Sequence, residues 1–264
     1  MNERIVRALR AAGCVAPERE AEALLEASAA GAGVVDDLVG RRLRGEPLAW
    51  VVGWAELLGV RVAVDPGVFV PRPHTEVLAR RAIELLPDDG VAVDLCTGSG
   101  AVAAVLLSAR PAATVVATDV DPAAIACARR NGVRALLGDL DRPVPPALLG
   151  RVDVVTAVVP YVPTGELRLL PRDVVDHEPR RALDGGADGT ETLARAAAAA
   201  RRWLRPGGHV VLELGGDQAA GIASLLRGLG FDEVRVLRDE DGLDRAIEAA
   251  APSHAPRKPM QSSA

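Results

Sequence analysis

The chain has 264 residues, a formal net charge of −5, 49% hydrophobic residues and 25% charged residues. Its length allows one large domain with a small appended module, and its composition is that of an ordinary globular protein. The acidic charge argues against duplex binding, because phosphate contacts need a basic surface. We expect no direct nucleic-acid contact and no membrane contact, since no apolar run approaches the ~18 residues of a membrane helix.

The cysteines and the N-terminus predict a cytoplasmic protein. The three cysteines, Cys14, Cys96 and Cys127, are odd in number, and no pair has the spacing of metal ligands. We interpret them as reduced thiols. The segment MNERIVRALRAAG is interrupted by charge and lacks the apolar stretch of a signal peptide. No metal site and no Ser-His-Asp or Cys-His arrangement is indicated.

Residues 1–45 are predicted to form a small helical module. The segments ERIVRALRAAG and PEREAEALLEASAAG place apolar residues at helical spacing, with Pro17 near a helix start and Gly31 near an end. The segment VVDDLVGRRLRG predicts a third, shorter helix. Residues 46–75 are rich in valine and interrupted by glycines, and this pattern predicts short strands joined by turns.

From about residue 91, short apolar runs alternate with helical segments. The runs are VAVDLCT, ATVVATDV, VRALLGD, VDVVTAVV and HVVLELG. Strands alternating with helices predict an α/β fold with a parallel sheet covered on both faces. Two later runs, DEVRVLRDE and LDRAIEAAA, follow these five and are joined by an Asp-Gly turn signal. The sheet should therefore finish with an antiparallel strand. Residues 252–264 are predicted to be a disordered tail.

The segment VDLCTGSGAVA is the sharpest local signal in the sequence. A strand runs into a glycine turn and a helix follows at once, so main-chain amides at the helix start are free for a ligand. Asp119 ends the next strand about 20 residues later, where an acid can accept hydrogen bonds from ribose hydroxyls. The pattern also satisfies the loose dinucleotide motif through Gly98, Gly100 and Ala103. A nicotinamide cofactor, or a tight turn with no ligand, therefore remains open.

Asp94 lies inside the strand before this turn, and an acid before Thr-Gly-Ser-Gly resembles the S-adenosylmethionine-dependent methyltransferases. In that group the acid and the loop bind the methionine part, and the residue matching Asp119 binds the ribose. The segment LLGDL, with Asp139 and Leu140, resembles the adenine-contacting position. The resemblance implies S-adenosylmethionine as cofactor, bound by Asp94, Cys96, Thr97, Gly98, Ser99, Gly100, Asp119, Asp139, Leu140 and Val158.

Six segments, including the glycine loop, place the chain closer to one family. GEPLAWVVGWAELLG, VDPGVFVPRPHTEVL, VDLCTGSGA, VPYVP, DHEPRRALDGGADG and LRPGGHVVLELGGDQ occur in the order seen in the HemK/PrmC family. Those enzymes methylate the glutamine side-chain amide in the Gly-Gly-Gln loop of peptide chain release factors, and the related PrmB enzymes act on a ribosomal protein. The resemblance runs from about residue 3 to residue 250.

The family resemblance implies a domain layout and a protein partner. A helical substrate-recognition domain over 1–45 would be joined by a β-hairpin linker over 46–75 to a Rossmann-like, seven-stranded S-adenosylmethionine-dependent methyltransferase domain over 76–251. The substrate would be a release factor or a ribosomal protein. Val159, Pro160 and Tyr161 would be the catalytic residues, and these three with Val158 and Glu178 would bind the substrate.

The departure from the family lies in the catalytic motif. The family's Asn-Pro-Pro-Tyr aligns with residues 158–161, which here read Val-Val-Pro-Tyr. The asparagine accepts a hydrogen bond from the substrate amide, and a valine side chain cannot do so. Thr156, Glu178 and His74 are the candidates to replace it, and each has an ordinary structural interpretation as well. Three hypotheses follow: a glutamine methyltransferase, a cofactor-binding pseudoenzyme, or a methyltransferase for another, less polar nucleophile.

Overall fold

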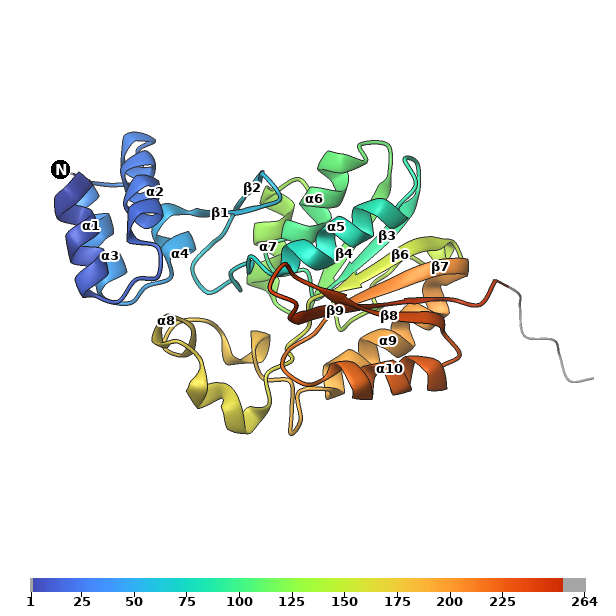
Figure 1. The fold of residues 1–264 in the computed structure, drawn as a ribbon. Helices are drawn as coiled ribbons and strands as arrows, with labels where there is room; N and C mark the ends of the chain where they lie inside the picture. Colours follow the sequence, from blue (N-terminus) through green and yellow to red (C-terminus); the bar gives the residue numbers. More distant parts are fainter. Residues whose placement is uncertain (1, 254–264) are drawn as a thin grey trace, which may run out of the picture.

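A computed structural model describes residues 2–253. Most of the tail predicted over 252–264 lies outside the described residues. A helical module at the N-terminus is joined by a hairpin to a larger domain built on a seven-stranded sheet (Figure 1). Within the described part of the chain, no helix has both the length and the apolarity that a membrane span requires.

The helical module contains α1 (Asn2–Ala11), α2 (Pro17–Ala29), α3 (Val35–Leu43) and α4 (Leu48–Val52). Apolar residues at helical spacing, such as Ile5 and Leu9, bring one face of each helix into a shared core. The buried members of that core are Ile5, Leu9, Ala21, Leu24, Ala27, Leu38, Val51 and Val52. The module therefore has a small core separate from that of the sheet.

The linker contains a two-stranded antiparallel hairpin, β1 (Trp54–Leu57) and β2 (Val60–Ala63). The strand expected at its beginning was wrong, because residues 48–52 form α4. Val51 and Val52 pack into the helical module, whereas Ala49 and Trp50 pack against the core of the larger domain. A strand would present only two opposite faces, so the helix is the conformation that buries all four residues between two bodies.

The sheet of the larger domain has the order β5-β4-β3-β6-β7-β9-β8. Its strands are β3 (Val91–Leu95), β4 (Thr114–Asp119), β5 (Arg134–Leu137), β6 (Val152–Ala157), β7 (Leu204–Glu213), β8 (Asp232–Arg238) and β9 (Asp244–Ala250). β9 is antiparallel to both of its neighbours, and the other pairs are parallel. The predicted seven-stranded Rossmann-like fold with a final antiparallel strand is confirmed.

Helices cover both faces of the sheet (Figure 1). One face carries α5 (Thr75–Leu85), α6 (Ala101–Ala109) and α7 (Pro122–Arg130), and the other carries α9 (Glu191–Trp203) and α10 (Ala219–Gly228). Alternate strand residues divide between the two cores, as Ala92 and Val93 do on β3. The β6–α9 connection contains η2 (Thr164–Leu169), α8 (Arg172–Val175) and η3 (Arg180–Ala182), and η1 (Pro146–Leu148) precedes β6.

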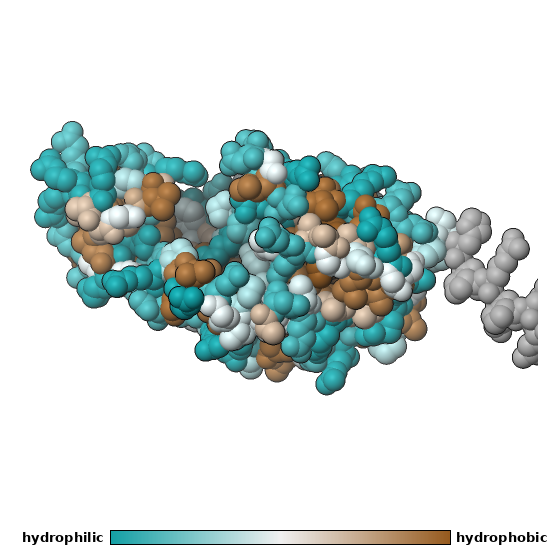
Figure 2. All heavy atoms as spheres, turned by 60° about the horizontal axis from the view of Figure 1, so that its bottom comes forward, coloured by the Kyte–Doolittle hydropathy of each residue, from teal (hydrophilic) through white to brown (hydrophobic). Residues whose placement is uncertain are grey.

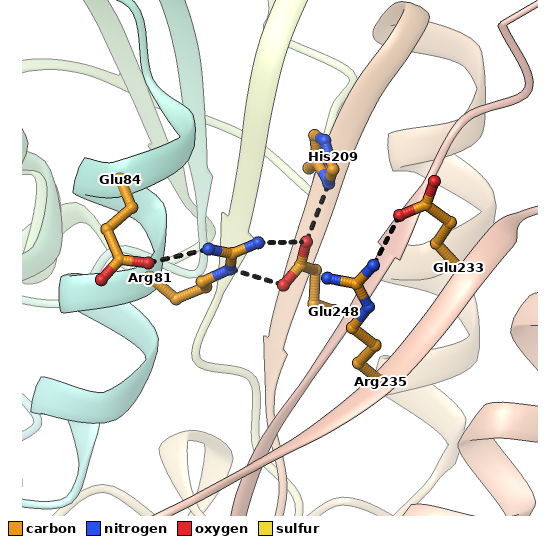
Figure 3. Close-up of polar contacts among 6 residues, drawn as sticks. All are labelled: Arg81, Glu84, His209, Glu233, Arg235 and Glu248. Carbon is orange, nitrogen blue, oxygen red and sulfur yellow. Dashed lines mark hydrogen bonds and ion pairs between the residues drawn. The ribbon is translucent and has the colours of Figure 1, made fainter.

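A cluster of charged side chains around the buried Glu248 links α5 to the sheet (Figure 3). The Nε atom of Arg81, on α5, donates to Glu248 on β9 at 2.6 Å. His209 on β7 lies 3.0 Å from the same carboxylate through its Nδ1 atom. Burial opposes ionisation of Glu248, but the contacts with His209 and Arg81 outweigh it and lower the pKa of Glu248 to about 2.

Candidate functional site

The site lies where the chain order of the sheet reverses, between β3 and β6. The chain leaves β3 towards β4 on one side and leaves β6 towards β7 on the other, so their carboxyl ends open a crevice. The loop after β3 holds residues 96–100, and the loop after β6 holds residues 158–161. The fold therefore brings the two strongest sequence motifs together.

Asp94 lies near the end of β3 and connects this strand to the glycine loop and to β6 through hydrogen bonds. Its side chain is buried, and its oxygens accept hydrogen bonds from the hydroxyls of Thr97 at 2.5 Å and Thr156 at 2.7 Å. Burial raises the pKa of Asp94 to about 6, although the two hydroxyls oppose this rise. Thr156, one candidate to replace the motif asparagine, is thus already bonded to Asp94 and fully buried in the sheet.

The glycine loop has a backbone conformation that few other sequences could adopt. Gly100 has a φ of 81°, and a Cβ atom there would lie 2.9 Å from the Cβ atom of Ala128. The amide of Gly98 donates to Asp119 at 2.9 Å, and the other oxygen of Asp119 accepts from the amide of Asp121 at 2.9 Å. Burial raises the pKa of Asp119. Asp119 therefore holds the loop in place from the end of β4.

A cavity beside this loop, here called the loop cavity, lies at the carboxyl end of β3 and β4. Five of the predicted residues line it: Cys96, Gly98, Asp119, Val158 and Pro160. Residues that the sequence did not single out complete the wall: Phe69, Val120, Asp121, Ala124, Pro179, Arg181 and Ala182. Burial raises the pKa of the Cys96 thiol, so this side chain stays neutral.

The other predicted cofactor residues do not line the loop cavity. Thr97 and Ser99 are buried within the loop. Asp139 is paired with Arg195 of α9 at 2.6 Å. Leu140 packs into the core beneath α9. These residues shape or support the loops, and their direct contact with a cofactor stays a prediction.

Asp121 and Arg181 form part of the wall from two distant segments. Asp121 caps the start of α7, because its Oδ1 atom accepts from the amide of Ala123 at 2.9 Å. Its Oδ2 atom lies 2.8 Å from Arg181, which belongs to η3. The sequence Asp-Pro after a strand is a helix-start signal that could have identified Asp121. Nothing local identifies Arg181, since its position depends on the β6–α9 connection.

A second cavity, here called the tyrosine cavity, has a volume of about 260 Å³ and lies on the other side of residues 158–161. Its walls are Phe69, Arg72, His74, Val159, Tyr161, Val162, Leu170, Pro171, Val174, Ala182 and Leu183. Phe69 and Ala182 also line the loop cavity. Among the described residues, no donor is bonded to the main-chain oxygen of Val159. Val159 is 2% exposed, and it contributes to the wall of the tyrosine cavity.

Three glycines allow the surrounding loops to close on the Pro-Tyr pair. A Cβ atom at Gly185 would lie 2.7 Å from the Pro160 oxygen, and one at Gly215 would lie 2.5 Å from the Tyr161 ring. At Gly189 the corresponding distance to the Tyr161 oxygen is 2.1 Å, at a φ of 75°. Each is too short for any side chain, so these glycines fix the position of Tyr161 through close packing.

Glu178, another predicted substrate residue and candidate acceptor, lies behind the tyrosine cavity. One carboxylate oxygen accepts from Arg72 at 2.5 Å and the other from the amide of Val70 at 3.2 Å. Burial raises the pKa of Glu178, although Arg72 opposes this. The guanidinium of Arg72 lies 4.7 Å from the centre of the Phe69 ring. Glu178 thus positions Phe69, through Arg72, between the two cavities.

His74, the third candidate, does reach the tyrosine cavity. Its Nε2 atom lies 3.2 Å from the hydroxyl of Tyr161 and 3.5 Å from Glu213 Oε1. Glu213 is fully buried at the end of β7, and its other oxygen accepts from the Thr75 hydroxyl at 2.6 Å. Burial raises the pKa of Tyr161 most, and the charge of Glu213 and the direct contact of its carboxylate with the phenol raise it further, so the phenol is neutral. The sequence analysis missed Glu213.

The comparisons with known proteins agree with this geometry. The FtsJ-like methyltransferase family matches residues 76–238. The release factor glutamine methyltransferase of Mycolicibacterium smegmatis is 38% identical over 264 residues, which cover 91% of this chain and 93% of the relative. That of Moorella thermoacetica is 37% identical over 273 residues, which cover 92% and 95%.

The chain belongs to the release factor glutamine methyltransferase family. The resemblance seen in the sequence is confirmed, and the nicotinamide alternative is set aside. A solved methyltransferase from Pyrococcus furiosus, with 22% identity and a TM-score of 0.54, covers 82% of this chain and 99% of its own, and it supports the fold.

This family membership makes the chain a methyltransferase that uses S-adenosylmethionine, and the side chains that line the loop cavity have the chemistry to bind parts of that cofactor. Carboxylates of Asp119 and Asp121 suit ribose hydroxyls and an ammonium group, while Phe69 and Val158 provide apolar walls. When bound, the cofactor supplies an electrophilic methyl group.

Proposed function

We propose that this enzyme methylates the side-chain amide of a glutamine in a peptide chain release factor, in the cytoplasm. The observation that carries the proposal is the pair of cavities that meet at residues 158–161. Val158 and Pro160 line the loop cavity, whereas Val159 and Tyr161 line the tyrosine cavity. A methyl donor in one cavity and an amide in the other would therefore meet across a short stretch of main chain.

The tyrosine cavity has the chemistry that an amide substrate needs. An amide nitrogen is a weak nucleophile because its lone pair is delocalised into the carbonyl group. Hydrogen bonds from its N–H groups to fixed acceptors orient the nitrogen and localise the lone pair. The unbonded oxygen of Val159 can accept one N–H, and Phe69 and Tyr161 can pack the methylene groups of a glutamine. Positioning of this kind is the main contribution a protein makes to such a displacement.

The helical module supports a macromolecular substrate. In Figure 2 a recess separates this module from the larger domain. The β6–α9 connection reaches the module, since Arg42 lies 3.6 Å from Asp173 and the Trp50 and His177 rings meet edge to face with centroids 6.4 Å apart. This connection also carries residues of both cavities, such as Leu183 and Arg181. A protein that docks on the module would thus contact the segment that closes the site.

The test is transfer of isotope-labelled methyl from S-adenosylmethionine to purified substrates. The reaction contains a release factor from the same organism, and a parallel reaction contains its large-subunit ribosomal proteins. The expected result is label on one glutamine of the release factor, identified by mass spectrometry, and loss of that label when this glutamine is replaced by alanine. Label on a ribosomal protein alone, or on neither, would contradict the proposal.

A further inference from the structure

Val158 stands where the family has an asparagine, so an amide substrate needs another acceptor. Glu213 Oε1 is buried and has no hydrogen-bond partner among the described residues. An unpartnered carboxylate oxygen inside a protein is costly, so it calls for a physical explanation. The atom lies 3.5 Å from His74 Nε2, which in turn lies 3.2 Å from the hydroxyl of Tyr161. Of these three contacting side chains, His74 and Tyr161 line the tyrosine cavity.

We propose that Tyr161, His74 and Glu213 form a proton relay that takes over the work of the lost asparagine. The Tyr161 hydroxyl accepts a hydrogen bond from the substrate amide and donates its own hydrogen to His74 Nε2. Together with the Val159 oxygen, it gives the two acceptors that orient an amide nitrogen. This inference rests on the proposed function, because the nucleophile it serves is a glutamine amide.

The relay also balances the reaction. The amide nitrogen forms a bond to the methyl carbon as the bond between that carbon and sulfur breaks, with its electron pair going to sulfur. The nitrogen then carries one proton too many. That proton passes to the Tyr161 oxygen while the Tyr161 hydrogen passes to His74 Nε2. The neutral product amide and a protonated His74 result, and no tyrosinate forms, in agreement with the raised pKa of Tyr161.

Glu213 gives this proton a favourable destination. In the resting state of the proposed relay, the unprotonated Nε2 has no hydrogen to offer Glu213 Oε1, an oxygen that lies 3.5 Å away and has no hydrogen bond among the described residues. Once Nε2 carries a proton, it can donate to both the Tyr161 oxygen and Glu213 Oε1. A buried carboxylate next to an imidazolium is a stabilising pair, whereas the same carboxylate next to a neutral imidazole is not. Glu213 is therefore a positioning residue that acts through His74.

The other charged groups near His74 are paired with groups of their own. Arg72 bonds to Glu178 at 2.5 Å, Arg245 bonds to Asp239 at 2.5 Å, and Glu76 bonds to Arg80 at 3.0 Å. Glu213 is thus the carboxylate that faces His74 Nε2 without a cationic partner among the described residues.

The first test reads the tautomer of His74 without turnover. In protein labelled with ¹⁵N-histidine, at about pH 8 where histidine is mostly neutral, the proposal expects Nδ1 of His74 to carry the proton and Nε2 to be free. Replacing Tyr161 with phenylalanine should shift this distribution and leave His209 unchanged. A spectrum with the proton on Nε2 of His74 in the unmodified protein would overturn the relay.

The second test compares turnover with a matched control. His74→Gln keeps a side chain that can bond to Tyr161 but cannot carry a proton, so kcat should fall about a hundredfold with little change in KM. Adding Tyr161→Phe to His74→Gln should cost little more, because members of one relay act as a unit. His209→Gln, which removes the histidine of the neighbouring Glu248 pair on β7, should leave kcat unchanged.

Restoration of the family residue separates the possible failures. Val158→Asn in the His74→Gln background should recover most of the lost kcat, since an asparagine there supplies an acceptor directly. If the unmodified chain labels the release factor and His74→Gln does so at the same kcat, the relay is wrong and the proposed function stands. If the unmodified chain labels no release factor, both the function and the relay fall.

Discussion

Two carboxylate–histidine pairs lie beneath α5, on the same face of the sheet. Glu248 meets His209 near the middle of the helix (Figure 3), and Glu213 meets His74 at its start. Strand β7 contributes to both, because it carries His209 and, at its carboxyl end, Glu213. The chemistry of the side chains is the same, so the difference between the pairs lies in what surrounds them.

The Glu248 pair is complete and the Glu213 pair is not. Arg81 donates to both oxygens of Glu248, at 2.6 and 3.0 Å. Glu213 has one hydroxyl donor, from Thr75, and no arginine among the described residues. A fully bonded buried charge adds to stability, whereas an incompletely bonded one beside a cavity is available for reaction. Both pairs contain a glutamate and a histidine, so residue type does not tell them apart. The oxygen of Glu213 that has no hydrogen bond among the described residues marks the pair that we propose to be functional.

Glu213→Gln should give the largest effect. It removes the charge that stabilises protonated His74, so we expect kcat for methyl transfer to fall about a hundredfold. The glutamine keeps an oxygen for the Thr75 hydroxyl, and stability should therefore change little. Steady-state kinetics and a urea unfolding curve on the same preparation provide the check. A loss of stability with unchanged kcat would make Glu213 an ordinary structural residue.

Glu248→Gln should show the opposite behaviour, with unchanged kcat and a loss of about 2 kcal/mol in the free energy of unfolding at neutral pH. The pKa of Glu248 lies at about 2, below its ordinary value of 4.5. A lowered pKa stabilises the fold above the unfolded value, and this contribution disappears as pH falls towards the folded value. Unfolding curves of both proteins should therefore converge between about pH 4.5 and 2. Curves that stay parallel would refute this assignment.

Gly215→Ala should have a smaller effect, through the position of Tyr161. The new Cβ atom would lie 2.5 Å from the Tyr161 ring, so the ring must move away from the two cavities. We expect kcat/KM to fall about tenfold, since small misplacements are costly in a positioning mechanism. Gly221→Ala is the matched control, because no atom lies within 4 Å of a Cβ there. Equal activities of the two variants would show that the close packing is not needed.

Arg181→Ala should have the smallest effect on stability. The Arg181 side chain is 60% exposed, although its partner Asp121 is largely buried. Pairs with an exposed member contribute at most about 1 kcal/mol, so the unfolding free energy should change by less than that. Thermal unfolding in the absence of cofactor is the measurement. A larger loss would mean that the β6–α9 connection depends on this contact.

Most of the sheet could be predicted because its signals are local. Buried parallel strands appear as apolar runs, and the predicted helix AVAAVLLSA matches α6 in full. The glycine loop and Asp119 follow from spacing along a strand–turn–helix unit. Helix α4 was missed because its four buried residues face two different cores, which a one-dimensional pattern of valines does not reveal.

The polar residues of the site were harder to predict, since their roles depend on neighbours far along the chain. Glu213 lies within the run HVVLELG, where a lone acid in an apolar strand signals a buried charge without naming its partner. His74 lies 139 positions earlier and meets it only through the packing of α5 on β7. Glu178 was predicted to lie near the substrate site, and it does lie beside the tyrosine cavity, but its carboxylate is bonded to Arg72.

The most direct test of the account is a single-turnover comparison of the unmodified chain with Val158→Asn, using labelled S-adenosylmethionine and the release factor. We expect the unmodified chain to transfer methyl to the glutamine, and the asparagine to raise the rate less than about tenfold, because an acceptor is already present. An almost inactive unmodified chain, with a rate that rises about a hundred- to a thousandfold in Val158→Asn, would contradict the presence of a substitute acceptor. A rise of that size is typical of restoring a missing preorganised group.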